Sequence, residues 1–164
     1  MGFQSQVRLT QTTGIVGEIL EGAPRSGYPA ILNSTSAANN VIGRGFSKVA
    51  GNDDEVAAGE GDTLPFAGIL VNPKVYSTSG ASTGALDPTI TLLNNEVVEI
   101  LEKGIIVVDF STAATIGQNV FYHNTTGVIA AATGTTLADH TQIPDANVIR
   151  RSIPSAGLGI IRIR

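Results

Sequence analysis

The hydrophobic positions of this chain fall into runs of four to six residues, separated by short clusters of Gly, Asn, Ser and Thr. The runs are rich in Val, Ile, Phe and Tyr, which is typical of strands and not of long helices. The pattern is densest in residues 96–131, where residues 105–110 have almost no polar alternation and are expected to be buried on both faces. Residues 124–127 (NTTG) predict a hairpin turn between runs 119–123 and 128–131. This stretch forms the centre of a predicted sheet.

The same criteria predict further strands along the chain, at residues 15–20, 28–33, 43–50, 64–71, 89–93, 147–151 and 158–164. Gly68 interrupts one of these runs and suggests a bulge or a close backbone approach. Three segments between the runs are predicted to be loops: residues 51–62 (acidic), 73–88 (rich in Ser, Thr and Gly) and 133–145 (polar, with a proline). The last strand, 158–164, is expected to protect a sheet edge with its outward cations.

Residues 95–104 allow two interpretations. Glu96, Glu99 and Glu102 recur every three residues with aliphatic residues between them, which fits a two-turn amphipathic helix. The β-branched residues and the strand that follows favour a strand instead, with Lys103 and Gly104 at the tip of a hairpin. We therefore predict strand at 96–103 and keep the helix as the alternative.

Taken together, about ten short strands and no long helix predict an all-β protein, an antiparallel sandwich or barrel that is jelly-roll-like, with little or no helix. The length of 164 residues favours one domain, or one domain with an arm. We predict a single β domain at residues 14–164 and an extended N-terminal arm at residues 1–13. Phe3, Val7 and Leu9 are the scattered apolar residues of that arm, and the spacing fits an extended chain with alternate residues on one side.

Charge is sparse and unevenly placed. The net charge is −4, and 15% of the residues are charged. The cations of the C-terminal end are Arg150, Arg151, Arg162 and Arg164, and the acids cluster at Asp53, Asp54, Glu55, Glu60 and Asp62. These are either two solvated patches or complementary surfaces of neighbouring subunits.

Several classes of partner and compartment are not expected. A nucleic-acid partner would need a concentrated basic face, and a membrane partner an apolar segment of about 18 residues. The chain has no Cys, so disulfides and thiolate metal sites are excluded. The first residues lack the apolar core of a signal peptide, and the protein is expected to be made in a cytoplasm.

Candidate chemistry is weak. Residues 80–84 match the G-x-S-x-G string around Ser82, but the nucleophile elbow needs an entering strand and a leaving helix, and this string lies in a predicted loop. His123 and His140 are the only imidazoles, without a metal-binding spacing, and the acidic segment lacks the register of a calcium loop. Carboxylate pairs such as Glu96 and Glu99 arise by chance in chains of this size. We expect no enzyme, no metal site and no cofactor.

Seven short motifs follow one another in order along residues 14–164. They are G-I-V-G-E (14–18), I-G-R-G (42–45), F-A-G-I-L-V (66–71), V-V-E-I-L-E-K-G-I-I-V-V (97–108), A-T-I-G-Q-N-V-F-Y (114–122), T-G-V-I (126–129) and A-G-L-G-I-I-R-I (156–163). In this order they resemble the structural cement, or head decoration, proteins of tailed bacteriophages. The resemblance does not include residues 1–13.

The resemblance implies a small, mostly β protein on the outside of an icosahedral head, in contact with the major capsid protein and without catalytic residues. It also implies a homo-oligomer, for which a trimer is favoured over a dimer. For the capsid or subunit interface, the candidates are Phe3, Val7 and Leu9 in the arm and Arg162 and Arg164 in the last strand. The alternatives are a tail or baseplate component of a virion and a hydrolase on a β scaffold.

Overall fold

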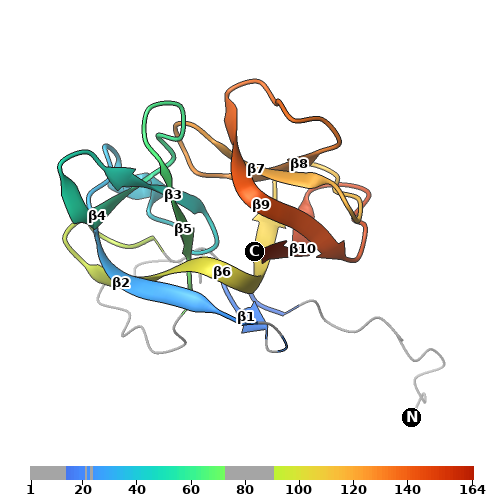
Figure 1. Ribbon diagram of the computed structural model, residues 1–164, viewed down its shortest axis with the longest axis horizontal. Helices are drawn as coiled ribbons and strands as arrows, with labels where there is room; N and C mark the ends of the chain where they lie inside the picture. The colour runs from blue at the N-terminus through green and yellow to red at the C-terminus, as the bar shows by residue number, and fades with distance from the viewer. Residues whose placement is uncertain (1–13, 21, 23, 73–90) are drawn as a thin grey trace, which may run out of the picture.

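The strand-rich pattern is confirmed by the computed structural model, which describes residues 14–20, 22, 24–72 and 91–164 (Figure 1). The described residues form ten strands and a single 3₁₀ turn, η1 (Ala37–Asn39). The strands are β1 (Ile19–Leu20), β2 (Ser26–Leu32), β3 (Gly45–Val49), β4 (Asn52–Ala58), β5 (Phe66–Leu70), β6 (Val97–Phe110), β7 (Asn119–His123), β8 (Ile129–Ala132), β9 (His140–Arg150) and β10 (Gly157–Ile163). None of the described residues belongs to a helix long and apolar enough to cross a bilayer.

Strand β6 is shared by two closed barrels. The first barrel is formed by β2, β4, β3 and β5, which pair in that order and return to β6. The second barrel is formed by β10, β9, β7 and β8, which also return to β6. Figure 1 shows the two barrels on opposite sides of the molecule, joined along β6. Of the two architectures that the sequence left open, the structure has the barrel.

Each barrel closes through one short parallel pairing. In the first barrel, Ile31 and Leu32 of β2 pair with Glu55 and Val56 of β4. In the second barrel, β6 and β8 meet through the pair Phe110 and Ile129. The other pairings in both barrels are antiparallel.

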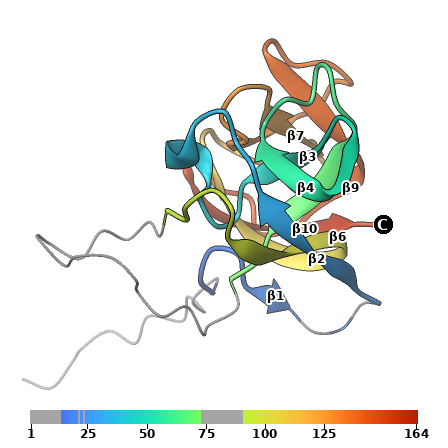
Figure 2. The same ribbon diagram turned by 90° about the vertical axis from the view of Figure 1, so that its left-hand side faces the viewer.

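Each barrel has its own aliphatic core. The first core includes Leu32, Phe46, Val56, Leu70, Val98 and Ile100. The second core includes Ile106, Val108, Phe110, Val120, Tyr122, Ile143, Val148 and Ile161, and reaches back to Ile69 and Leu101 of the first barrel. A smaller cluster on the outer face of the second barrel contains Ile105, Val107 and Ile160 and packs against Leu20 of β1. In both views β1 lies on the outer side of β6 (Figures 1 and 2).

A bulge allows one strand to serve both cores. The register between β2 and β6 shifts so that Ser26 pairs with Lys103 and the next residue, Gly27, pairs with Leu101. Because alternate residues of a strand face opposite sides, one extra residue changes which positions face a given core. Leu101 faces the second core before the bulge, and Ile106 faces it afterwards. The prediction that residues 105–110 are buried on both faces is confirmed for Ile105 to Val108 and for Phe110, whereas Asp109 is exposed.

The structure decides the interpretation of residues 96–103 in favour of the strand. The predicted hairpin tip at Lys103 and Gly104 is wrong, because β6 runs through both residues without reversing. Gly104 has φ +141° and lies where the pairing partner changes from β2 to β10. The glycine therefore marks a change of partner within one strand.

Two predicted loops contain strands. Residues 52–58 of the predicted acidic loop form β4, in which Asp53 and Asp54 are exposed while Val56 and Ala58 are buried. The acidic half of the strand faces solvent, and its charges led to the prediction of a loop although the second half of the strand is apolar. In the same way, the predicted polar loop 133–145 contains the start of β9 at His140.

Three strand predictions need correction. Only Ile19 and Leu20 of residues 15–20 are strand, because residues 16–17 form a turn. Within 89–93, the described residues contribute a single bridge, between Thr91 and Val41. Strand β10 does not lie at an edge, because it pairs with β9 on one side and β6 on the other. The loop predicted at 73–88 lies outside the described residues.

Candidate functional site

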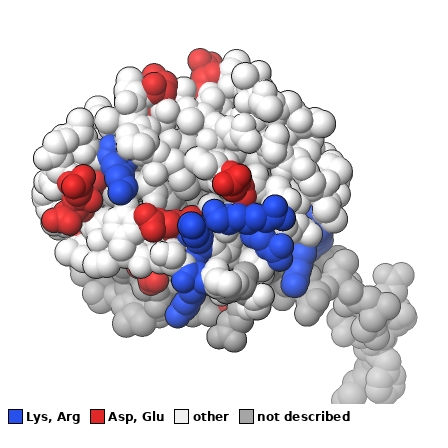
Figure 3. All heavy atoms as spheres, viewed as in Figure 1, with Lys and Arg blue, Asp and Glu red and all other residues white. Residues whose placement is uncertain are grey.

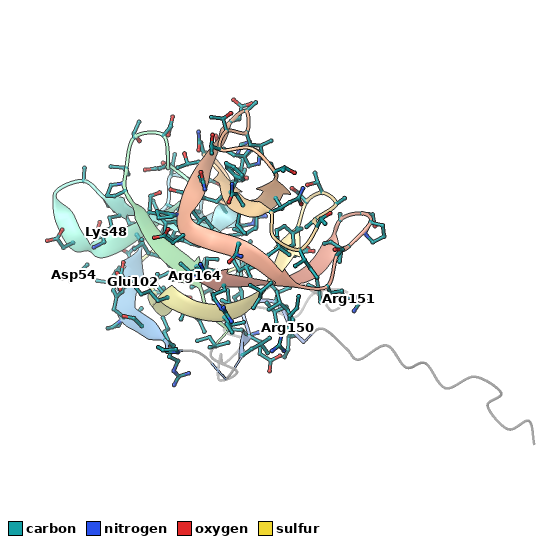
Figure 4. The ribbon with its side chains drawn as sticks, turned by 45° about the vertical axis from the view of Figure 1, so that its right-hand side comes forward. Lys48, Asp54, Glu102, Arg150, Arg151 and Arg164 are labelled. Atoms are coloured by element: carbon teal, nitrogen blue, oxygen red, sulfur yellow. The ribbon has the colours of Figure 1, made fainter. Side chains whose placement is uncertain are left out.

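The basic residues of the C-terminal end come from two paired strands. Arg150 ends β9 and pairs with Ile160 of β10, and Arg162 lies farther along β10 opposite Asn147. Arg164 follows β10 and is exposed, whereas Arg162 is half-buried. Figure 3 shows blue side chains gathered over one face of the molecule, and Figure 4 shows Arg150, Arg151 and Arg164 around the ends of β9 and β10. Strand pairing thus unites two groups of arginines that are separate in sequence.

The acidic residues of β4 lie on the other barrel. Asp53 and Asp54 are exposed on its outer side, and Glu55 is half-buried and accepts a hydrogen bond of 2.6 Å from Asn33 Nδ2. Figure 4 shows Asp54 with Lys48 on the first barrel, far from Arg150 and Arg151. The acids of β4 and the arginines that end β9 therefore lie on different barrels, although the second barrel also exposes Asp139 and Asp145.

The turn between β7 and β8 connects the two barrels. Its residues accept bonds from the first barrel: the Gly45 amide donates to Gly127 O over 2.8 Å, and Arg44 Nη1 donates to Thr126 O over 3.2 Å. The turn is stabilised by His123, whose Nδ1 accepts from the amides of Thr125 (3.1 Å) and Thr126 (3.3 Å). Gly127 has φ +70°, and the predicted hairpin is confirmed. His123 is therefore used to shape the turn.

Tyr122 is the central side chain of this junction. It belongs to β7 of the second barrel and is fully buried, with its ring 5.3 Å from that of Phe66 in the first barrel. Its hydroxyl lies 3.0 Å from Ser47 Oγ, which itself donates to Gly59 O over 2.5 Å. Burial raises the pKa of Tyr122, the bond to Ser47 lowers it in part, and the charge of Asp62 raises it further. The phenol thus stays neutral and joins the barrels by a hydrogen bond as well as by packing.

A cleft of about 540 Å³ opens beside the junction. Its walls combine the turn before β1 (Ile15 and Val16), the segment before β3 (Val41 to Arg44), and residues of the second barrel, among them Asp109 and Leu158. The lining is mainly aliphatic. Burial lowers the pKa of the Arg44 guanidinium, which also donates to Asn39 Oδ1 over 3.2 Å.

The turn that forms one wall of the cleft is held rigidly. The Gly17 amide donates to Val107 O over 2.8 Å, and the Asn72 amide donates to Gly17 O over 2.9 Å. Gly17 has φ +76°, and a side chain there would overlap Ile42. The cleft is therefore a fixed feature of the fold.

Comparison with known proteins identifies the family. A family model described as structural cement protein (E217 gp24/Pam3 gp6) matches residues 3–164. The chain belongs to this family. The similarity to a known structure agrees in fold: a chain of "The capsid of Myoviridae Phage XM1" aligns with a TM-score of 0.61 and 18% identity, covering 100% of this chain and 98% of that chain. The comparison with curated proteins found no match.

Membership of the structural cement family confirms the resemblance that the ordered motifs suggested, and extends it from residue 14 back to residue 3. This cement protein is a structural component of a phage virion that associates with the capsid shell. The family is described as one of structural proteins.

The candidate interface residues divide into two groups. Arg162 and Arg164 lie on or next to β10, among the basic residues of the second barrel. Phe3, Val7 and Leu9 lie outside the described residues, as does Ser82 of the G-x-S-x-G string. The cleft was missed because its residues come from segments far apart in sequence, and no motif connects Ile15 with Asp109 and Leu158.

Side chains of the types that bind metals are scattered among the described residues. Within residues 14–20, 22, 24–72 and 91–164, no three His, Asp or Glu side chains gather as a metal site would require. The rings of His123 and His140 lie 4.9 Å apart, edge to face. His140 Nδ1 lies 2.6 Å from Ala138 O, so both imidazoles contact the local backbone.

Proposed function

We propose that this cement protein binds the outer surface of the assembled head, contacts the major capsid protein and bridges its neighbouring subunits as a homo-oligomer, with a trimer favoured over a dimer. The observation that carries the proposal is the match of residues 3–164 to the structural cement family, together with the exposed cations Arg150 and Arg164 at the ends of β9 and β10. A protein that bridges subunits needs more than one binding surface, and in this proposal the arm of residues 1–13 is the second.

The physics of bridging suits such a small protein. Each contact with the shell needs only modest affinity, since contacts held in one oligomer raise one another's effective concentration, and avidity exceeds single-site affinity by about 10²–10⁴. A ligand that binds the assembled shell and not its separated subunits stabilises the shell by mass action. In this proposal the protein is made in the host cytoplasm and binds the head there, and it binds neither nucleic acid nor membrane.

The proposed capsid or subunit interface comprises the basic residues of the second barrel, with Arg162 and Arg164, and the arm of residues 1–13, with Phe3, Val7 and Leu9. In this proposal residues 14–164 form one folded unit that carries the arm. The exposed arginines are available for charge-assisted bonds to carboxylates of the capsid protein.

The test uses heads that lack the cement protein, to which purified protein is added before sedimentation. Wild-type protein is expected to sediment with the heads and to raise the temperature at which they open. The double variant Arg150→Glu/Arg164→Glu is expected to lower retention at least about tenfold in 0.15 M salt, because each reversal replaces attraction with repulsion. Asp53→Lys/Asp54→Lys is the matched control on the other barrel, with an expected change below about threefold.

Two results would contradict the proposal. Equal retention of the two double variants would show that the arginines are not at the interface. Labelled protein found on tails or baseplates by negative-stain imaging, and not on heads, would support the alternative of another virion module.

A further inference from the structure

The cleft beside the barrel junction is a concave surface lined by described residues of both barrels. Its volume of about 540 Å³ is in the range of clefts that bury a ligand, about 300–1,000 Å³. Ile15 on its wall is 56% exposed, although it is a large aliphatic side chain. The occupant that this lining suits is apolar.

Two charged side chains line the cleft, and they differ in their hydrogen bonding and exposure. The Arg44 guanidinium is partly used by the fold, because its Nη1 donates to Asn39 Oδ1 and Thr126 O. The Asp109 carboxylate lies on an exposed residue of β6. An occupant with apolar side chains and one cation would match this arrangement, since Asp109 favours a positive partner.

The first thirteen residues of the chain have this composition. Phe3, Val7 and Leu9 are apolar, and Arg8, between two of them, is the only charged side chain of the segment. In an extended strand Val7 and Leu9 point to one side and Arg8 to the other. The segment can therefore offer two aliphatic side chains to the walls and a guanidinium to the carboxylate.

The cleft of the same molecule is poorly placed to receive these residues. The arm joins the domain at Gly14, next to Ile15 on the cleft wall, so Val7 could enter only if the chain reversed between them. Residues 10–13 are Thr-Gln-Thr-Thr, with β-branched residues that favour extended backbone and without Gly, Pro, Asn or Asp. The turn after Gly14 is fixed to β6 through the bond from the Gly17 amide to Val107 O. In an extended conformation the seven residues 7–13 span about 23 Å, which is the distance that Val7 can reach from Gly14.

We infer that the arm of one copy binds in the cleft of a neighbouring copy, with Val7 and Leu9 against its aliphatic walls and Arg8 paired with Asp109. The inference rests on the proposed homo-oligomer and deepens it by naming the contact. An arm that leaves one copy and enters the next is a head-to-tail contact, which closes into a ring when each copy gives one arm and receives one. Because the contact joins two different surfaces, the arm and the cleft, a ring with an odd or an even number of copies can form, and no surface has to bind to itself.

Cysteine cross-linking tests the contact directly, because the chain has no native Cys. Val7→Cys protein mixed with Leu158→Cys protein, under mild oxidation, is expected to give a covalent pair of two different chains. Val7→Cys mixed with Asp54→Cys is the control, since Asp54 lies on the outer side of β4, and should give none above background. The mixtures are analysed both free and on heads. Absence of the Val7–Leu158 product in both would overturn the inference.

The two other occupants have their own signatures. The Val7→Cys/Leu158→Cys chain would close on itself as a cross-linked monomer if the arm filled its own cleft. A photoreactive label on Val7→Cys would modify the major capsid protein, and not a second copy, if the arm bound the shell. Either result would overturn the inference.

A charge exchange tests the ion pair. Arg8→Asp and Asp109→Arg are each expected to raise the dissociation constant of the oligomer at least about tenfold, and the double variant to restore it to within about threefold of wild type, measured by light scattering during size exclusion. Failure of the double variant to recover would contradict the pairing. The proposed function fails separately: protein that shows the Val7–Leu158 cross-link but does not sediment with heads would disprove head binding and leave the arm exchange in place.

Discussion

The two barrels share β6 and are built alike, but their outer surfaces differ. Each has five strands, an aliphatic core and one short parallel closure. The first barrel exposes Asp53 and Asp54, and the second exposes Arg150 and Arg164. The cores follow from the alternation of apolar residues, whatever the outward residues are. Outward positions are therefore free to carry charge of either sign.

The barrels also differ in what each contributes to their joint. The second barrel supplies the buried aromatic residue, Tyr122, and the turn that accepts bonds from Arg44. The first supplies small groups that allow the close approach: Gly45 packs against the Tyr122 side chain, and Ser47 Oγ is hydrogen-bonded to the Tyr122 hydroxyl. We therefore expect the barrels to unfold together.

The largest expected effect comes from removing one core ring in each barrel. Phe46→Ala in the first core and Phe110→Ala in the second should each lower the free energy of unfolding by about 3–5 kcal/mol, because a fully buried ring leaves a cavity. If the barrels are coupled, both variants will show a single transition, displaced as a whole, by circular dichroism and calorimetry. Two transitions, of which only one moves in each variant, would show that the barrels are independent units.

A glycine in the first barrel is expected to give the next largest effect. Gly68 has φ +152°, and a Cβ there would overlap Leu101 O of β6, while the register of β3 and β5 shifts opposite it. Gly68→Ala should cost about 3 kcal/mol, as left-handed backbone costs about 1–2 and overpacking about 1–3.

The matched control for this substitution is Gly51→Ala. Gly51 also has a positive φ, +79°, but nothing lies within 4 Å of its Cβ position. It should cost only the backbone part, about 1–2 kcal/mol. Urea unfolding of both variants gives the comparison, and equal losses would mean that the approach of Gly68 to β6 is not tight.

Both barrels were predicted in part from sequence. In the second barrel the hairpin of β7 and β8 and the last strand follow from runs of Val, Ile and Phe, with Gly127 in the turn, whereas the first half of β9 was predicted as a loop. In the first barrel, β4 was mistaken for a loop because its exposed half is acidic and its buried half ends in two alanines. The bulge in β6 was not predictable, since it depends on the pairing of Gly27 with Leu101. Gly68 was an exception, because a glycine within an apolar run already suggested a close approach.

The candidate site was predicted less completely than the fold. The arginines of β9 and β10 were visible as a cluster near the C-terminal end, and strand pairing brought them onto one surface. The cleft gave no signal, because Ile15, Asp109 and Leu158 meet only when β1, β6 and β10 are packed together. Sequence patterns report local alternation, whereas a cleft depends on contacts between distant segments.

The smallest expected effect is that of the hydroxyl which joins the barrels. Tyr122→Phe keeps the packing against Phe66 and removes only the bond to Ser47, which still donates to Gly59 O. At pH 8 the variant should lose about 1 kcal/mol of unfolding free energy.

The difference in unfolding free energy between wild type and variant should depend on pH, because burial raises the pKa of Tyr122 above its unfolded value of about 10. Below pH 10 both states are protonated and the contribution of the phenol is complete. Above it the unfolded chain loses the proton first, so wild-type stability falls while that of the variant does not respond through this group. The gap should therefore be smaller at pH 10.5 than at pH 8. Urea unfolding at both pH values tests this, and Tyr28→Phe is a useful comparison, since burial and Glu102 also raise the pKa of Tyr28. A gap that stays constant between the two pH values would show that Tyr122 ionises as easily in the folded protein as in the unfolded chain, and that the junction between the barrels is open to water.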